Sequence, residues 1–381
     1  MTAPLPLHTH GRVEGVIQPE ILKVMTLDEA RSSHLSSADV LIWRHDGDHI
    51  QMRRSGAEPI TLRELKDPRV VQPGDVVRLR PGASLISVLY RRGSSSNTLF
   101  ATERCNSLCL MCSQPPRDED DSWRVGEMLR VVSLVDRHEQ QLGVTGGEPT
   151  LLGDGLAEVL NACRRYLPDT LVPVLTNGRL FRDRPLAERL QAAHPNQVSW
   201  AIPLYSDVAE IHDEVVAATG AFDETLEGLF ELGRLGARIE VRVVLHRMTV
   251  PRLPQLAAFI YRRLPFVRHV ALMGLEPMGF ARTNRERLWV DPADYIAELQ
   301  DAAFHLLNRG MQASIYNLPL CVLPRSLWPY ARQSISGWKN LFPAECEGCA
   351  VREHCSGFFT SAGPAWRSRV VRPLDLAELV Q

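Results

Sequence analysis

Three cysteines lie close together at residues 105–112, in the run Cys-Asn-Ser-Leu-Cys-Leu-Met-Cys. Spacings of three and two intervening residues bring the thiols of Cys105, Cys109 and Cys112 onto one short loop. A closed zinc site and a fully ligated four-iron cluster each need four ligands, one more than this loop supplies. The fourth ligand must come from elsewhere. The spacing alone leaves an iron–sulfur cluster, a zinc ion and an accidental grouping open.

A glycine-rich turn follows about forty residues later, where residues 144–150 read Val-Thr-Gly-Gly-Glu-Pro-Thr. Leu142 before this turn and Leu151 and Leu152 after it are apolar, which is typical of a buried strand that ends in a loop. Two glycines at such a position allow the backbone to approach a ligand closely. The turn is therefore a second segment of this chain that could contact a ligand.

A second set of cysteines lies near the end of the chain, where Cys346, Cys349 and Cys355 follow the pattern Cys-x₂-Cys-x₅-Cys and Cys321 lies upstream. These four thiolates suit either a structural zinc ion or a four-iron cluster, and spacing alone does not choose between them. The remaining cysteine, Cys163, lies in a helical segment, where we expect a small buried hydrophobic side chain.

The composition is that of a soluble globular protein, with 381 residues, of which 45% are apolar and 23% charged. A formal net charge of −2 gives no electrostatic reason to expect binding to nucleic acid or to an anionic membrane. The start of the chain lacks a signal-peptide pattern, and no segment has the apolar length of a membrane span. Of the eight cysteines, three lie in a first cluster and three in a second, which fits metal binding in a reducing compartment, so we expect a cytoplasmic protein.

The first part of the chain predicts a small β-rich domain over residues 1–96. Short β-branched runs alternate there with turn signals. The predicted strands are Val40–Arg44, His49–Arg53 and Val76–Arg80, with short helical pieces at Asp28–Arg31 and Arg63–Leu65. A loop at Arg91–Asn97 is the expected boundary.

The second part alternates apolar strands with amphipathic helices. The predicted strands are Thr98–Thr102, Leu142–Thr145, Val172–Thr176, Gln197–Ile202, Ile239–His246 and His269–Leu275. The predicted helices are Val125–Val135, Leu156–Tyr166, Leu186–Ala192, Phe222–Leu235 and Pro254–Leu264. This order predicts an α/β fold, a partial (β/α)6 TIM-like barrel over residues 97–285, followed by a cysteine-rich C-terminal extension over residues 286–381. Both chemical motifs follow predicted strands, where barrel sites gather.

Three further polar residues follow or lie in predicted strands. Asn177 precedes Gly178 at the end of the third strand, where a simple turn and a role in the site are equally compatible with the sequence. Arg242 interrupts an apolar strand, so its side chain either faces the barrel lumen and pairs with a carboxylate, for which the cofactor is one source, or extends outward to solvent; we favour the lumen. Glu276 follows the sixth strand, where a substrate contact is one interpretation and a simple loop turn is the one we expect.

The cysteine loop and the Gly-Gly-Glu-Pro turn resemble the radical SAM superfamily, and the resemblance extends over about residues 97–360. It implies that Cys105, Cys109 and Cys112 hold a [4Fe-4S] cluster whose open iron binds S-adenosylmethionine (SAM). Such enzymes cleave SAM reductively and use the resulting 5′-deoxyadenosyl radical to abstract hydrogen.

The same resemblance implies roles for residues that contact the cofactor. Gly146, Gly147 and Glu148 match the family segment that holds the methionine amino group. Ser206 matches a serine that meets the ribose or carboxylate of the cofactor. Met111 occupies the position of a residue that packs on the adenine and is often aromatic in the family, so the packing role there departs from the usual pattern.

The second cysteine set resembles the SPASM and shorter twitch extensions of radical SAM peptide-maturing enzymes. A full SPASM extension has a further cysteine where this chain has Phe359, and no cysteine follows Cys355. The resemblance therefore implies one auxiliary [4Fe-4S] cluster, held by Cys321, Cys346, Cys349 and Cys355.

The cysteine loop up to Pro116 and the run Gly-Trp-Lys-Asn at residues 337–340 are most similar to the C-type radical SAM maturase of His-Xaa-Ser peptide systems. This similarity implies hydrogen abstraction from a ribosomally made precursor peptide, with crosslinking as the expected outcome, beside a partner maturase and an external electron donor. Alternatives are a radical SAM enzyme for a small molecule, an activator of a glycyl-radical protein, and a zinc-stapled binding protein. For the β-rich domain we weigh a structural cap against strand-wise binding of a leader peptide along Val76–Arg80.

Overall fold

The computed structural model describes residues 5–46, 49–54, 59–334 and 339–375. The chain forms two compact units. The first unit comprises residues 1–101, 122–144 and 154–172. The second comprises residues 102–121, 145–153 and 173–381, and it contains both cysteine sets.

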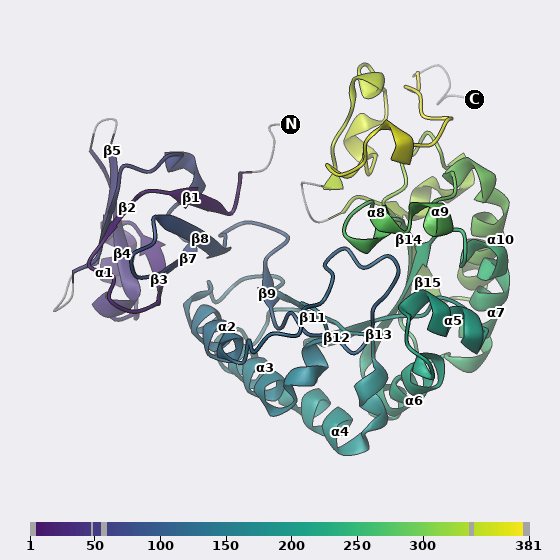
Figure 1. The fold of residues 1–381 in the computed structure, drawn as a ribbon, viewed down its shortest axis with the longest axis horizontal. Helices are drawn as coiled ribbons and strands as arrows, with labels where there is room; N and C mark the ends of the chain where they lie inside the picture. Colours follow the sequence, from purple (N-terminus) through teal and green to yellow (C-terminus); the bar gives the residue numbers. More distant parts are fainter. Residues whose placement is uncertain (1–4, 47–48, 55–58, 335–338, 376–381) are drawn as a thin grey trace. The chain divides into compact units, whose positions relative to one another are not determined.

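The first unit contains an eight-stranded sheet (Figure 1). Its strands are β1 (His8–His10), β2 (Arg12–Glu14), β3 (Glu20–Met25), β4 (Val40–Asp46), β5 (His49–Arg53), β6 (Thr61–Arg63), β7 (Val76–Leu79) and β8 (Leu85–Tyr90). They are hydrogen-bonded in the order β1-β8-β7-β3-β4-β5-β6-β2. The three strands predicted in this region are therefore confirmed. The core of the sheet consists of aliphatic side chains such as Leu22, Leu41, Met52 and Ile86.

The sheet closes on itself through one bent segment. β1 pairs with β8 and β2 pairs with β6, and only Gly11 separates β1 from β2. A Cβ atom at Gly11 would lie 2.7 Å from Leu65 Cδ2 and 3.2 Å from the Arg63 carbonyl oxygen, so a larger residue at the bend would displace the Leu65 side chain. β7 is hydrogen-bonded to β3 on one side and β8 on the other, so it has no free edge. The hypothesis that Val76–Arg80 adds a leader peptide as a strand is therefore wrong.

Two short segments outside the predicted strands behave differently. Helix α1 (Leu27–Ser32) is confirmed at Asp28–Arg31 and begins with a capping box between Thr26 and Glu29. The predicted helical piece at Arg63–Leu65 is wrong, because Arg63 ends strand β6 and Glu64 has a φ of 55°. A helix does not continue through a residue with that left-handed backbone conformation.

The remaining elements of the first unit are β9 (Thr98–Phe100), α2 (Trp123–Leu134), β10 (Gly143–Thr145, of which Thr145 belongs to the second unit) and α3 (Asp154–Tyr166). The Lys23 ammonium is buried and donates hydrogen bonds to the Leu134 carbonyl oxygen (2.7 Å) and to Asp136 Oδ1 (2.6 Å). The Arg78 guanidinium in β7 lies 2.7 Å from the Glu127 carboxylate in α2. The β-rich sheet and α2 are thus joined by buried and half-buried ion pairs.

The second unit is an α/β structure built on parallel strands. Strands β11 (Val172–Leu175, of which Val172 belongs to the first unit), β12 (Val198–Pro203), β13 (Arg238–Leu245), β14 (His269–Gly274), β15 (Gln312–Tyr316) and β16 (Ala331–Arg332) lie side by side in this order. The pairs from β12 to β16 are parallel. Its helices are α4 (Arg184–Ala193), α5 (Ala209–Val216), α6 (Ala221–Arg234), α7 (Leu253–Arg263), α8 (Phe280–Thr283), α9 (Arg285–Leu288) and α10 (Ile296–Leu307). Figure 1 shows α4, α6, α7 and α10 along the outer side of the strands.

All six strands and all five helices predicted from residue 98 onward are present, with ends shifted by a few residues. β15 and β16 add two strands that the sequence pattern did not indicate. The alternating α/β order with parallel strands is confirmed. Closure of these strands into a partial (β/α)6 barrel stays a prediction, as do the domain boundaries at residues 96 and 285.

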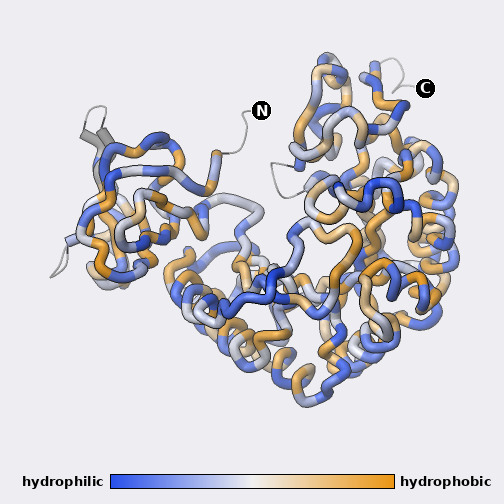
Figure 2. Tube along the Cα trace, viewed as in Figure 1, coloured by the Kyte–Doolittle hydropathy of each residue, from blue (hydrophilic) through white to orange (hydrophobic). Residues whose placement is uncertain are grey.

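Strand β13 shows how the sequence separates the two faces of the sheet. Ile239, Val241, Val243 and Leu245 are buried, and the residues between them are only partly buried. This period of two places the charged side chain of Arg242 on the opposite face from the aliphatic core. Along the helices, hydrophobic and hydrophilic residues alternate (Figure 2).

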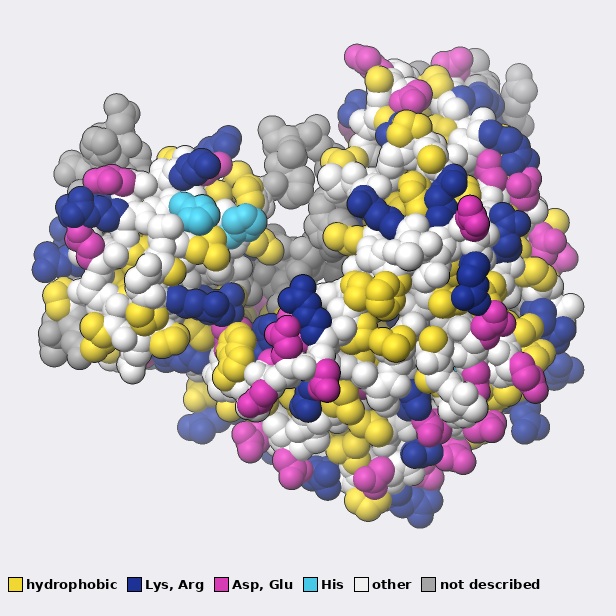
Figure 3. Space-filling view, in the orientation of Figure 1, with side chains coloured by type: hydrophobic (Ala, Val, Ile, Leu, Met, Phe, Trp, Pro, Cys, Tyr) yellow, Lys and Arg dark blue, Asp and Glu magenta, His cyan; other side chains and the backbone are white. Residues whose placement is uncertain are grey.

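The surface carries both signs of charge. On the face drawn in Figure 3, Lys and Arg side chains are interspersed with Asp and Glu side chains, in keeping with the net charge of −2. Among the helices that the structure describes, none has the length and apolar character needed to cross a membrane.

Candidate active site

Asp121 joins the two ends of the segment that carries the cysteine loop, residues 102–121. The Oδ1 atom of Asp121 accepts a hydrogen bond from Thr102 Oγ1 (3.0 Å), and its Oδ2 atom accepts one from the backbone N–H of Glu103 (2.6 Å). Both ends of residues 102–121 are therefore held together by one buried carboxylate.

The loop is also fixed along its length by other elements of the second unit. The backbone N–H groups of Leu108 and Leu110 donate to the carbonyl oxygens of Val216 (3.0 Å) and Val215 (2.9 Å) in α5. The Arg179 guanidinium donates to Ser107 Oγ (3.0 Å). Such contacts preorganise the three thiols before any metal binds.

Cys105, Cys109 and Cys112 line one cavity of about 1260 Å³, its open mouth included. Burial raises the pKa of Cys105 to about 11 and that of Cys109 to about 12, and negative charge on neighbouring groups adds to both shifts. The thiols are therefore protonated at neutral pH unless positive charge is placed among them, as metal coordination does. Three half-buried thiols beside an open cavity fit a cluster that leaves one iron free for a ligand.

The Gly-Gly turn lies directly against the cysteine loop. Gly147 donates its N–H to the Thr102 carbonyl oxygen (2.7 Å), and Glu148 donates its N–H to the Arg104 carbonyl oxygen (2.8 Å). Gly146 has a φ of 147°, a backbone angle that residues with a side chain rarely adopt. Gly146 and Gly147 both line the cavity, so the sequence correctly placed this turn beside the cysteines.

We expect Gly147→Ala to disrupt the site, because the new Cβ atom would lie 2.1 Å from the Arg104 carbonyl oxygen. A backbone atom cannot turn away as a flexible side chain can, so the loop carrying Cys105 must shift. The expected result is at least a tenfold weaker affinity for SAM, about 1.4 kcal/mol or more, measured by equilibrium binding to the anaerobically reconstituted protein.

Gly126→Ala is the matched control, because Gly126 lies in helix α2 and a Cβ atom added there would have no neighbour within 4 Å. This change is expected to leave SAM affinity unchanged and to stabilise the helix by about 1 kcal/mol. Equal SAM affinities for the two variants would contradict the close packing assigned to Gly147.

Glu148 is fully buried, and its carboxylate is engaged within the protein. It accepts hydrogen bonds from the Thr150 backbone N–H (3.0 Å) and hydroxyl (2.5 Å), from the Thr176 hydroxyl (2.6 Å) and from the Asn177 backbone N–H (2.6 Å). Burial raises the pKa of Glu148, and these donors act in the opposite direction. The carboxylate thus ties the Gly-Gly turn to the end of β11, and direct contact with the cofactor stays a prediction.

We expect Glu148→Gln to lower thermal stability and SAM affinity together. Both carboxylate oxygens of Glu148 accept hydrogen bonds, so the NH₂ group of a glutamine would face another donor in place of one of these oxygens. A charge-assisted hydrogen bond of about 1.5–3 kcal/mol is therefore lost. Thermal unfolding of the apo protein and SAM binding measure the two effects. Glu158→Gln, on the exposed face of α3, is the control. Unchanged unfolding temperature and affinity would remove Glu148 from this positioning role.

Two of the remaining predicted residues line the cavity with polar groups. The Asn177 amide donates to Asn106 Oδ1 (2.5 Å), and its Oδ1 accepts from the Arg179 N–H (3.1 Å). Gly178 has a φ of 79°, so the Asn-Gly turn and the position at the site are both observed. Arg242 lines the cavity, and its Nη1 lies 3.7 Å from Glu240 Oε1; an orientation toward a barrel lumen stays a prediction.

Met111 and Ser206 occupy different surroundings. Met111 lines the cavity and packs in a buried cluster that includes Tyr205 and Leu275. Ser206 is buried, and its hydroxyl accepts a hydrogen bond from the Val208 N–H (3.1 Å). Tyr205, which precedes Ser206 in the sequence, lines the cavity. The roles of Met111 and Ser206 toward the cofactor stay predictions.

Several residues of the cavity were not assigned from the sequence. Asn317, at the end of β15, and Lys339 line it, and Glu276 faces it where the sequence favoured a plain turn. Asn317 follows the end of a strand, which is where site residues are expected, but the sequence pattern does not indicate strand β15. Lys339 belongs to the Gly-Trp-Lys-Asn run, whose Gly337 and Trp338 lie outside the described residues.

The four tail cysteines line a second, smaller cavity of about 270 Å³. Burial raises the pKa of Cys346 to about 11 and also raises those of Cys321 and Cys355. Backbone N–H groups of Leu320 and Gly357 donate to the sulfur of Cys355 (3.4 and 3.5 Å). In the described part of the chain, no group of three or more His, Cys, Asp or Glu side chains is placed so that it could hold a single metal ion.

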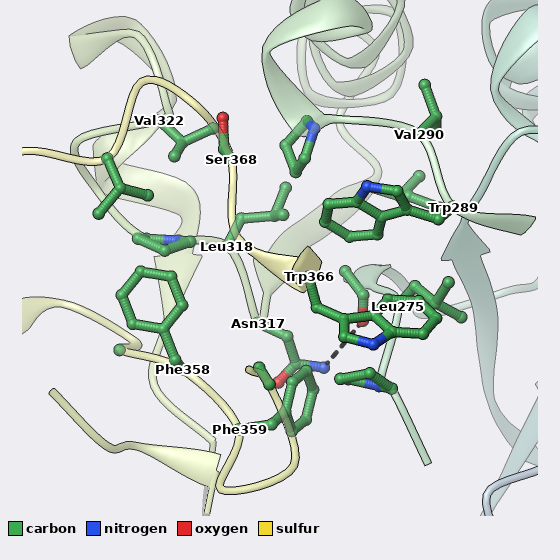
Figure 4. Close-up of a pocket in the computed structure, with 18 of the residues that line it drawn as sticks. Leu275, Trp289, Val290, Asn317, Leu318, Val322, Phe358, Phe359, Trp366 and Ser368 are labelled. Atoms are coloured by element: carbon green, nitrogen blue, oxygen red, sulfur yellow. Dashed lines mark hydrogen bonds between the residues drawn. The ribbon is translucent and has the colours of Figure 1, made fainter. Parts of the chain in front are cut away.

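The tail packs on the strand ends of the second unit through an apolar pocket (Figure 4). Phe358, Phe359 and Trp366 of the tail surround it together with Leu275 and Trp289. Asn317, whose amide lies 3.4 Å from the Gly274 carbonyl oxygen, lines both this pocket and the cysteine cavity. The tail cysteines are thus carried on a segment whose aromatic residues abut the wall of the first cavity.

The family assignment rests on the segment that contains the cysteine loop and the Gly-Gly turn. A family model described as the radical SAM superfamily matches residues 99–260. These residues form a radical SAM domain. The cysteine loop, the Gly-Gly turn and Arg242 all lie inside the matched segment.

The radical SAM domain also resembles a curated protein named probable GTP 3′,8-cyclase, from Methanocella arvoryzae. The two are 30% identical over 142 residues, which is 37% of this chain and 44% of that protein. The chain therefore spans less than half the length of this curated relative.

Solved structures show more distant similarity. One is titled native anSMEcpe with bound AdoMet and Cp18Cys peptide, with a TM-score of 0.41 and 16% identity, covering 57% of this chain and 62% of that one. Another is coproporphyrinogen III oxidase from Escherichia coli, with a TM-score of 0.42 and 15% identity, covering 54% of this chain and 51% of that one.

Proposed function

We propose that this chain is a radical SAM enzyme that modifies a ribosomally made precursor peptide of the His-Xaa-Ser repeat type. The observation that carries the first part is the meeting of three cysteine thiols and the Gly146–Gly147 backbone in one open cavity within a radical SAM domain. When bound, a [4Fe-4S] cluster supplies one electron to the SAM sulfonium, whose C5′–S bond breaks to give methionine and a 5′-deoxyadenosyl radical that takes a hydrogen atom from a substrate carbon.

The residues of the chain have separate tasks in this proposal. Cys105, Cys109 and Cys112 hold the cluster. The backbone of Gly146 and Gly147 approaches the methionyl group, and Glu148 fixes that backbone from behind. Arg242 supplies positive charge on the cavity wall, where it suits the cofactor carboxylate.

The cysteines of the tail favour a large substrate and a second redox site in this proposal. Its four cysteines line a separate cavity, which suits an auxiliary [4Fe-4S] cluster of SPASM or twitch type. A crosslink requires the substrate radical to lose one further electron and one proton, and an auxiliary cluster is a suitable electron acceptor. The external electron donor, the partner maturase and a cytoplasmic location belong to the same proposal.

One observation favours a second candidate, a small-molecule substrate. The relative named probable GTP 3′,8-cyclase is 30% identical over 142 residues of this chain. A purine nucleotide is therefore the competing substrate class for the same cavity.

The decisive test incubates the reconstituted, reduced enzyme with SAM and either a His-Xaa-Ser repeat peptide or GTP. We expect 5′-deoxyadenosine in both reactions and a mass change in the peptide alone. A changed nucleotide with an unchanged peptide would establish the second candidate. Absence of 5′-deoxyadenosine from every reaction would contradict the radical SAM activity itself.

A further inference from the structure

Two side chains of opposite charge stand in the wall of the cysteine cavity. Glu276 follows strand β14, and Lys339 precedes the tail cysteines. The Lys339 ammonium lies 3.2 Å from Glu276 Oε2, and the two side chains are 20% and 17% exposed. The ammonium also lies 5.6 Å from the centre of the Phe359 ring. This pair is therefore largely withdrawn from solvent on a wall that faces the cofactor site.

The Glu276 carboxylate is incompletely bonded. Its Oε1 atom is buried and has no hydrogen-bond partner in the described part of the chain. A buried carboxylate oxygen without a donor is destabilising, and a half-buried ion pair adds little to stability over apolar side chains of similar volume. Stability of the fold alone does not account for this arrangement.

The loop that carries Glu276 is held against the third cysteine. Phe280 donates its N–H to the Cys112 carbonyl oxygen (2.8 Å), and Met278 donates its N–H to the Glu276 carbonyl oxygen (2.9 Å). A Cβ atom at Gly279 would lie 2.4 Å from the Cys112 carbonyl oxygen, so only glycine permits this approach. The position of Glu276 relative to Cys112 is thus set before any ligand arrives.

We propose that Glu276 and Lys339 bind an amide group of the substrate, with Glu276 accepting its N–H and Lys339 donating to its C=O. This inference rests on the proposed function and names the part of the substrate that is recognised. An acceptor beside a donor matches a group that offers both. An ammonium, such as that of SAM, has donors only, and Lys339 repels it.

Two sources offer that chemistry. The N–H and C=O of one residue in an extended peptide point to the same side, as they do between paired strands. The edge of guanine also places an N–H beside a carbonyl oxygen. The proposed peptide substrate is the first source, and the relative named as a GTP cyclase makes the second a necessary arm of the test.

The experiment measures binding of two probes to the anaerobically reconstituted enzyme with S-adenosylhomocysteine present. The probes are a synthetic peptide of three His-Ala-Ser repeats and GTP. The variants are Glu276→Gln and the double change Glu276→Met with Lys339→Met. Glu214→Gln is the control, because Glu214 pairs with Arg287 (2.7 Å) on the exposed surface of the same unit.

We expect Glu276→Gln to weaken peptide binding at least tenfold and the control to leave it unchanged. The double variant should lose peptide binding while its thermal unfolding temperature stays equal or rises. If these variants lose affinity for GTP and keep their affinity for the peptide, the pair recognises the amide of a nucleotide base, and the peptide is not its ligand.

The inference is overturned if affinity for both probes is unchanged, or if only affinity for S-adenosylhomocysteine falls. A fall of several degrees in the unfolding temperature of the double variant would also overturn it, because the pair is then a structural ion pair. Wild-type enzyme that binds neither probe overturns the amide assignment, whereas wild-type enzyme that fails to cleave SAM contradicts the proposed function itself.

Discussion

Alanine in place of Cys105, Cys109 or Cys112 is expected to abolish formation of 5′-deoxyadenosine from SAM under strong reductant. These three thiols line one cavity, and a cluster with an open iron needs all of them. Iron content should fall from roughly eight to roughly four per chain, a count taken from two four-iron clusters. Iron analysis and chromatography of the reaction products measure both effects.

Cys163→Ala is the matched control for this series. Cys163 is fully buried in helix α3, outside both cysteine cavities, and burial raises its pKa to about 12. Its replacement should leave iron content and SAM cleavage as in the wild type. Production of 5′-deoxyadenosine at the wild-type level by any of the three loop variants would refute the assignment of the cluster ligands.

Alanine in place of Cys346 or Cys349 is expected to abolish peptide modification and to leave SAM cleavage without substrate. Both residues line the tail cavity, which is distinct from the cavity lined by Cys105, Cys109 and Cys112. Iron should again fall to roughly four per chain, but the remaining cluster is the one that binds SAM. Parallel assays of 5′-deoxyadenosine and of the peptide mass separate this pattern from that of the loop variants.

His354→Ala serves as the control for the tail, because His354 adjoins Cys355 in sequence and is not among the residues that line the tail cavity. It should retain peptide modification. A wild-type protein with about four irons and one tightly bound zinc ion would show instead that the tail is a structural staple without a redox role.

Strong periodic patterns allowed much of the fold to be predicted. The apolar runs that became β11 to β14 alternate with helices whose buried faces recur at helical spacing, as in α6 with Phe222, Leu229 and Leu232. β15 escaped prediction because its five residues, Gln-Ala-Ser-Ile-Tyr, carry a weak apolar signal. The piece at Arg63–Leu65 failed because helix propensity was overridden by pairing with β2.

The cysteine loop and the Gly-Gly turn could be located from sequence because cysteine is scarce in this chain and each motif lies within a few consecutive residues. Lys339 and Glu276 could not be paired, because 62 intervening residues separate them and only the packing of the tail brings them together. The inward orientation of Glu148 was equally hidden, since it depends on donors from Thr176 and Asn177, which follow strand β11.

The most direct test of the central assignment measures 5′-deoxyadenosine and methionine formed from SAM by the wild-type protein, purified and reconstituted with iron and sulfide without oxygen and then reduced with dithionite. A brown protein that forms the two products in equal amounts is the expected result. A colourless protein that binds zinc at both cysteine sets and forms neither product would contradict it.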